Sequence, residues 1–284
     1  MIYTLFILSF LISNNLFADT NSAYRLENNF NEDQGNDFHQ PLKYALYSMI
    51  LPGTGEYCFS RKQSLDINKK LKKRAFVFLG IEAISWGINI YNRDKYNKKM
   101  QSYRKYADNN WSFADWIRDY HEFEFEDQYS YLWENSSGQY MGIGESSHYI
   151  QFYYGDSNQI IRTTDINFKE NILDVLVDAM GAEEDIYSGT YSVEVIKDQH
   201  FYENIGKYNE FFSGWADGDV DHISISVTEH GYHTPRSPIK NNYLNSYDKA
   251  EKFSDYAEGA LWCIYFNHFI FHIKRFNIIH SFGI

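Results

Sequence analysis

Two apolar segments near opposite ends of the chain constrain its fold more than any other feature. The first runs from Ala75 to Tyr91 and the second from Ala260 to Ile273. Both contain polar side chains: Glu82, Trp86 and Asn89 in the first, and Asn267, His268 and His272 in the second. A polar group in apolar surroundings is costly unless it has a partner. We therefore expect the two segments to pack together, with Glu82 close to Asn267.

The spacing of these polar residues is helical. Glu82, Trp86 and Asn89 recur at i, i+4 and i+7, which places them on one stripe of a helix. A second long helix is predicted from Ser246, and its packed positions repeat at a spacing of three or four: Ala250, Phe253, Ala257, Ala260, Ile264, Asn267 and Phe271. We predict that both apolar segments span or half enter a membrane. The alternative is a pair of buried helices in a soluble bundle.

The amino terminus predicts export. Residues 1–18 contain no charged side chain, and Ala18 precedes a polar stretch. This pattern is typical of a signal peptide cleaved after Ala18. A retained anchor is the alternative, but the apolar run from Ile2 to Ile12 is short against the roughly 20 residues that a crossing needs. Residues 19–42 are rich in Asn, Asp and Glu, and we expect a disordered leader.

Charge is distributed unevenly along the chain. The formal net charge is −12. The segment Arg61–Arg74, which we name the basic segment, has seven Lys or Arg against the single Asp66, a local +6. Subtracting this from the total leaves −18 for the remainder, which disfavours nucleic acid as a partner. We expect the basic segment to be a loop that lies beside anionic headgroups.

The predicted fold is mainly α. Residues 43–95 and 246–284 form a small membrane-associated helical unit, and residues 96–245 form a polar, mostly helical excursion with a minor β element. Lys43–Phe59 is expected to be a short helix and a tight turn that crosses the membrane, so that the excursion is periplasmic. Within the excursion we predict strands at Tyr191–Ile196 and Ile223–Val227, a helix at Ile172–Met180 and a loop at Pro235 and Pro238.

The order of several motifs resembles a functionally uncharacterised family of bacterial envelope proteins, marked by a PGxGxxY turn and a C-terminal NHxxSxxDA-like helix. Here the turn is Pro52, Gly53, Thr54, Gly55, Glu56 and Tyr57, and it is followed by the helix with Glu82 and Trp86. Asn267 and His268 match the C-terminal motif, whereas Phe271 and Lys274 stand where that family has Ser and Asp. The resemblance implies an exported or membrane-embedded protein. It implies no reaction.

The sequence has no phosphate-binding or nucleophile-elbow motif. His222, His230 and His233 could hold zinc in a metal-dependent envelope hydrolase, or could be surface histidines. Glu56, Glu82 and His268 could relay protons, or could hydrogen-bond helices together. Tyr and Trp are abundant enough for glycan binding, although a packed aromatic core explains them too. Cys58 and Cys263 either pair or are two separate thiols.

From these features we predict a non-enzymatic bacterial cell-envelope protein with a scaffolding or assembly role. Its expected partners are membrane lipid and other envelope proteins, with its central region outside the cytoplasm and no cofactor. The residues expected to matter for this role are Pro52, Gly53, Gly55, Glu56, Tyr57, Glu82, Trp86, Asn89, Asn267 and His268.

Overall fold

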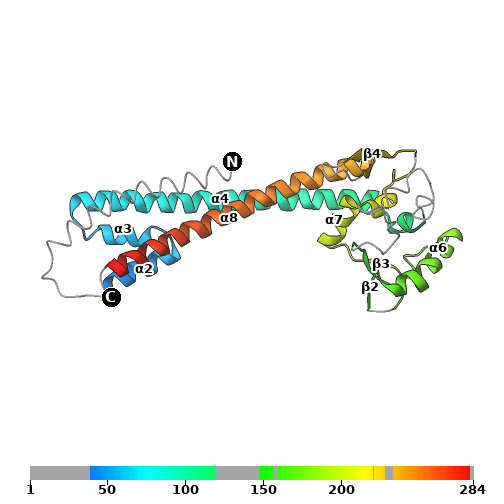
Figure 1. Ribbon diagram of the computed structural model, residues 1–284, viewed down its shortest axis with the longest axis horizontal. Helices are drawn as coiled ribbons and strands as arrows, with labels where there is room; N and C mark the ends of the chain where they lie inside the picture. Colours follow the sequence, from blue (N-terminus) through cyan, green and yellow to red (C-terminus); the bar gives the residue numbers. More distant parts are fainter. Residues whose placement is uncertain (1–38, 119–147, 157–158, 220, 228–232, 282–284) are drawn as a thin grey trace. The chain divides into compact units, whose positions relative to one another are not determined.

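The computed structural model describes residues 39–118, 148–156, 159–219, 221–227 and 233–281. The protein is mainly helical with small β-sheets, which confirms the mainly α prediction in this coarse form (Figure 1). It divides into two compact units. Unit 1 takes the chain up to Asn97 and from Glu251 onward, and unit 2 is Lys98–Ala250. The predicted signal peptide lies outside the described residues, as does most of the predicted leader.

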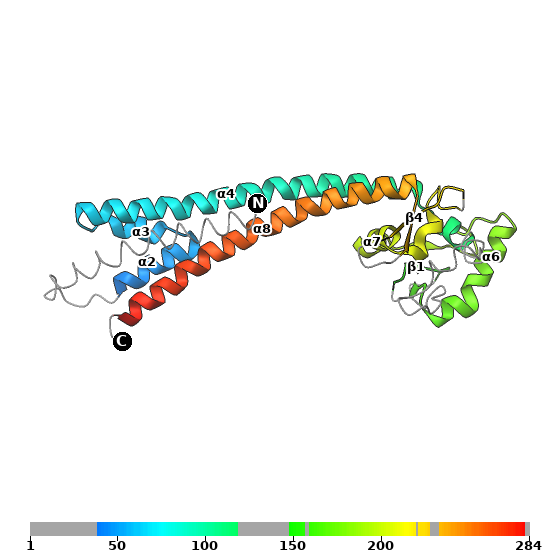
Figure 2. The ribbon, with the colours of Figure 1, turned by 45° about the horizontal axis from the view of Figure 1, so that its top comes forward.

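Unit 1 is built from helices. Helix α2 spans His39–Ile50, α3 spans Thr54–Ser60, and the long helices α4 (Leu65–Asn110) and α8 (Pro238–Ser281) contribute to both units. Both views show α2 and α3 beside the first part of α4 and the last part of α8 (Figures 1 and 2). Neither long helix contains an internal proline, and Pro238 stands in the first turn of α8, where its missing amide hydrogen costs no helical bond.

Two contacts fix the register of α4 and α8 in unit 1. Asn89 Nδ2 donates to the carbonyl of Ala257 at 2.8 Å, and Asn267 Nδ2 donates to that of Phe78 at 3.2 Å. Moving ten residues forward on α8 therefore moves eleven back on α4, so the two helices are antiparallel here. Ala257 and Ala260 are buried in this contact, and their small side chains let the helices approach closely.

Unit 2 is a small α+β body. Strands β1 (Gln151–Tyr153), β2 (Ile160–Arg162) and β3 (Glu194–Val195) form an antiparallel sheet in the order β2-β1-β3, with Phe152 opposite Ile161 and Val195. Strands β4 (Ser224–Val227) and β5 (His233–Arg236) form a separate antiparallel pair. The helical parts are residues 113–118, a π-helical turn at Phe168–Ile172, α6 (Leu173–Gly181), α7 (Gln199–Lys207) and a 3₁₀ helix at Asn209–Gly214.

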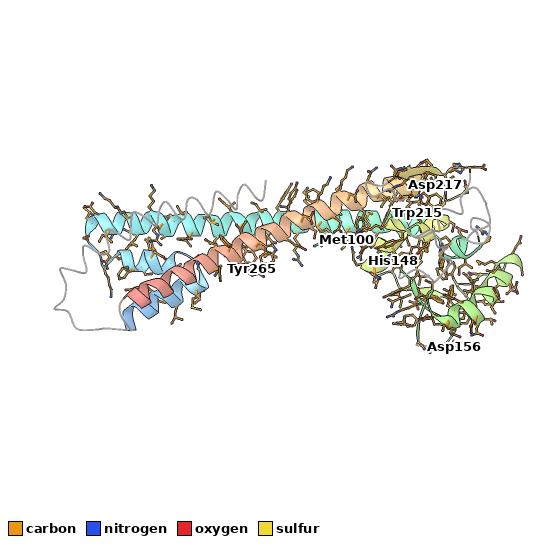
Figure 3. All side chains as sticks on the ribbon, viewed as in Figure 1. Met100, His148, Asp156, Trp215, Asp217 and Tyr265 are labelled. Atoms are coloured by element: carbon orange, nitrogen blue, oxygen red, sulfur yellow. The ribbon has the colours of Figure 1, made fainter. Side chains whose placement is uncertain are left out.

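The core of unit 2 is aromatic. Its largest fully buried side chains include Trp116, Trp215, Tyr103, Tyr243, Phe113, Phe152, Phe168, Phe211 and Phe212. The indole nitrogen of Trp215 donates to the Ile205 carbonyl at 2.9 Å, and that of Trp111 donates to the Phe211 carbonyl at 3.0 Å. Burying these indoles therefore costs no hydrogen bond, because backbone carbonyls of α7 and of the 3₁₀ helix accept from them. Trp215 is labelled in Figure 3.

Several sequence predictions were wrong. Among the described residues, no helix carries an apolar stretch sufficient to cross a membrane, which overturns the predicted transmembrane helices, including the crossing at Lys43–Phe59. The apolar stretch Ala75–Tyr91 would be about 25 Å long as a helix against a bilayer core of about 30 Å, and Glu82 and Asn89 interrupt it.

The boundaries of other elements also differ from the predictions. The basic segment is largely helical, because α4 already begins at Leu65. Helix α8 begins at Pro238 and not at Ser246, and Pro235 lies in β5, so the predicted loop at the two prolines does not form. The strand at Ile223–Val227 and the helix at Ile172–Met180 are confirmed within a few residues, whereas only part of Tyr191–Ile196 is a strand.

Candidate functional site

A buried polar cluster joins α4 to α8 in unit 1. Asn267 Nδ2 donates to Glu82 Oε2 at 2.9 Å, and the indole nitrogen of Trp86 donates to Glu82 Oε1 at 3.0 Å. His268 Nε2 lies 3.3 Å from the same Oε1. Glu82 and Asn267 are both nearly inaccessible. We name these four residues the Glu82 cluster. The predicted contact between Glu82 and Asn267 is confirmed.

The Glu82 cluster is paired well enough to tolerate its burial. Hydrogen bonds to a carboxylate are worth about 1.5–3 kcal/mol each, but removing the charge from water costs several kcal/mol. The net stabilisation is therefore small, and the stronger effect is to favour one register of α8 along α4 over others. Any shift of α8 along α4 would separate the Asn267 amide from Glu82 and leave buried polar atoms without partners.

The PGTGEY motif forms the turn between α2 and α3 with Pro52 and Gly53, and its last four residues begin α3. Gly53 has a φ of 94°, and a Cβ there would lie 2.5 Å from the Ala75 carbonyl oxygen of α4. A Cβ on Gly55 would lie 2.0 Å from the Tyr44 carbonyl oxygen of α2. Only glycine fits these two close approaches of backbone to backbone. Thr54 Oγ1 donates to the carbonyls of Tyr47 and Leu51, at the end of α2.

A second buried carboxylate follows this turn. Ser48 Oγ donates to Glu56 Oε2 at 3.3 Å and accepts the backbone N–H of Gly55 at 2.7 Å. Ser48 was not singled out from the sequence, and neither were the buried Arg74 and Ser85 of α4. The helical spacing of Arg74, Glu82, Ser85 and Asn89 on one side of α4 could have indicated them. Of the remaining motif residues, Pro52 is buried in the turn and Tyr57 of α3 is exposed.

The outward faces of the same helices are apolar. On α4, Glu82 is the only charged residue between Ala75 and Tyr91, and it is buried. From Gly259 to Phe269, α8 has no Asp, Glu, Lys or Arg. Eleven of the exposed large apolar side chains of these helices form what we name the apolar exterior: Leu46, Met49 and Ile50 of α2, Phe76, Ile84, Trp86, Ile90 and Tyr91 of α4, and Trp262, Tyr265 and Phe269 of α8. Tyr265 is labelled in Figure 3.

The histidines considered for zinc do not form a metal centre in the part of the chain that the structure describes. No group of three or more His, Cys, Asp or Glu side chains there is placed to hold a metal ion. His222 Nδ1 lies 2.7 Å from Asp219 Oδ1, and this hydrogen bond raises the pKa of His222. His230 lies outside the described residues, and His233 begins β5.

The two cysteines are free thiols, Cys58 on α3 and Cys263 on α8. Burial raises the pKa of Cys263, so the thiol form is favoured. Because both thiols are free, the structure has no disulfide between Cys58 and Cys263.

One buried amine in unit 2 was not anticipated. Lys240 is completely inaccessible, its Nζ donates to the Pro235 carbonyl at 3.2 Å, and the nitrogen lies 5.3 Å from the centre of the Phe212 ring. Burial, with a smaller contribution from Arg236, lowers the pKa of Lys240 to about 7. The buried carboxylate of Asp217 hydrogen-bonds to groups other than this amine. It accepts the Ser237 hydroxyl at 2.6 Å and the Ile239 N–H at 2.8 Å, at the start of α8.

No protein-family model, no curated protein and no solved structure matches this chain. The chemistry of its described residues is therefore the basis for any functional assignment.

Proposed function

We propose that the chain is a non-enzymatic cell-envelope protein with a scaffolding or assembly role, in which unit 1 lies in apolar surroundings and unit 2 is a folded body in water. The observation that carries this proposal is the distribution of polarity in unit 1. Its interior contains a carboxylate and amides beside apolar side chains such as Phe78 and Ile264, and its exterior contains the large apolar side chains of three helices.

Water is a poor solvent for such an exterior. Exposed apolar side chains occur singly on most soluble proteins, but extended groups of them mark contacts with protein or lipid. Trp86, Trp262 and Tyr265 have rings with one apolar and one polar end, the type of side chain enriched where lipid meets water. The surroundings of unit 1 are therefore membrane lipid at the interface, or apolar surfaces of other envelope proteins.

Features of the sequence support the same placement. Residues 1–18 predict export, and the order of the PGTGEY turn, Glu82, Trp86, Asn267 and His268 resembles an envelope family. The charge of −18 outside the basic segment disfavours nucleic acid. No observation on the described residues favours a hydrolase built on His222. None favours a glycan-binding surface either, since the aromatic side chains described in unit 2 are mostly in its core.

Cell fractionation tests the proposal. The full chain should sediment with membranes, resist extraction by salt and dissolve in mild detergent. The variant Phe76→Ser, Ile84→Ser, Ile90→Ser should shift to the soluble fraction, because it makes the exterior of α4 polar without touching the Glu82 cluster.

A matched control uses three exposed apolar residues of unit 2: Ile160→Ser, Ile166→Ser and Val227→Ser. This control should sediment like the unchanged chain. A full chain that remains a partner-free monomer in a detergent-free extract would remove the proposal.

A further inference from the structure

We propose that the apolar exterior of unit 1 docks on the surface of an anionic lipid bilayer, with the basic segment among the headgroups and the helices lying in the interface without crossing it. This inference rests on the proposed function and identifies the partner of unit 1 by its chemistry.

The first argument is the position of the positive charge. Arg61, Lys69 and Lys73 are exposed, and Lys69 and Lys73 lie on the first turns of α4. Phe76, the first residue of the apolar exterior on α4, follows within one turn of Lys73. A surface that takes up the Phe76 side chain is therefore within reach of the lysines. Anionic headgroups over acyl chains offer both chemistries at this spacing.

The second argument is the sign of the remaining charge. Outside the basic segment the chain has a formal charge of −18, so an anionic surface repels most of it and attracts it at basic stretches. The basic segment, at +6, is the more positive of these, since residues 93–105 have six Lys or Arg against Asp94, a local +5. A neutral apolar partner would not explain why positive charge is concentrated beside the apolar exterior while the rest of the chain is negative overall. A second copy of the chain would bring two basic segments or an acidic region against the apolar exterior.

The third argument is the burial of polar groups. Glu82, Asn89 and Asn267 have hydrogen-bond partners inside unit 1, so insertion of the outer faces into the interface leaves no polar side chain of this set in lipid. Interfacial helices bury their apolar faces about 5–10 Å deep, a depth that requires no crossing. This geometry agrees with the absence of a helix able to span a membrane among the described residues.

The test is vesicle flotation with the purified full chain. One set of vesicles contains phosphatidylcholine alone, and the other contains equal amounts of phosphatidylcholine and phosphatidylglycerol. The unchanged chain should bind the anionic vesicles about tenfold more tightly or better, and added salt should weaken this preference.

The variant Lys69→Gln, Lys72→Gln, Lys73→Gln should lose the preference but bind neutral vesicles as before, since glutamine is also a good helix former. The control Lys99→Gln, Lys105→Gln, Lys252→Gln removes the same charge at exposed positions elsewhere and should keep the preference. Circular dichroism of each variant checks that the helices are intact.

Equal binding to both vesicles would overturn the inference and leave the proposed function standing, as would equal losses in the two lysine variants. If the chain ignores both vesicles yet sediments with cell membranes, its partner is a protein and the inference fails alone. If it neither binds vesicles nor sediments with membranes, both proposals fail.

Discussion

The two units of this chain differ in where their largest aromatic and their acidic side chains lie. Among the described residues of unit 2 the tryptophans are inside, and Trp215 has only 2% of its surface exposed. In unit 1 Trp262 is 66% exposed, while Glu82 is 5% exposed. Unit 2 follows the ordinary rule that large apolar side chains are mostly inside, and the outer faces of α4 and α8 in unit 1 depart from it. The two units therefore differ in the side chains that their surfaces expose, although both regions are rich in aromatic residues.

The largest effect should come from comparing tryptophans. Trp215→Ala removes a buried indole and its hydrogen bond to Ile205, and we expect a loss of about 3–5 kcal/mol in the free energy of unfolding. Trp262→Ala should change stability by less than about 0.5 kcal/mol, because the side chain is exposed. Urea unfolding in detergent measures both. Equal losses would mean that the two units do not differ in what they bury.

The glycines of the turn provide a second test. Gly55→Ala should cost about 1–3 kcal/mol, because the added methyl meets the backbone of α2. Gly87→Ala on the exterior of α4 is the matched control: nothing lies within 4 Å of its Cβ position, and alanine favours the helix by about 1 kcal/mol. Thermal unfolding should therefore shift in opposite directions. A shift in the same direction for both would contradict the close approach of α2 and α3.

The Glu82 cluster allows the role of buried polar groups in unit 1 to be tested directly. Glu82→Leu leaves the amide of Asn267 and the indole of Trp86 without the carboxylate, and we expect a loss of about 1–3 kcal/mol. Pairing it with Asn267→Leu should recover part of this loss, because both ends of the buried contact then become apolar. A double-mutant cycle measures the coupling. If Glu82→Leu alone were more stable than the unchanged chain, the buried carboxylate would not be needed for the stability of unit 1.

The last prediction concerns the buried amine of unit 2. The pKa of Lys240 is lowered to about 7 in the folded chain, against about 10.4 for an unfolded lysine. Between these values the unfolded chain holds the extra proton, so Lys240 makes stability rise with pH by at most about 1.4 kcal/mol per unit. Below about pH 7 both states are protonated and this slope disappears.

Lys240→Met should flatten the rise, and urea unfolding at several pH values between about 7 and 9.5 would show it. Above this range the buried Tyr202 and Tyr243 complicate the comparison, because burial raises the pKa of both phenols. They lower stability as pH rises, since only the unfolded tyrosines ionise. Identical slopes for the two chains would contradict a neutral Lys240.

The sequence by itself predicted that the two apolar segments are helices and that Glu82 meets Asn267, but not where the long helices begin. The i, i+4, i+7 spacing placed Glu82, Trp86 and Asn89 together, and the cost of burying polar groups without partners predicted the contact with Asn267. It could not determine membrane crossing. The same apolar residues that suggest a span are, in α4, an outward face beside a polar inward face, and that distinction depends on which side α8 covers.

Only the tertiary structure decided where the remaining polar groups lie. Ser48 meets Gly55 and Glu56 because the turn folds α3 back onto α2, and Lys240 is buried because β5 and the aromatic core of unit 2 enclose it. Burial depends on neighbours that are distant in sequence, and periodicity along one helix does not specify them. For that reason local spacing predicted the elements, whereas the polarity of each surface required the packed chain.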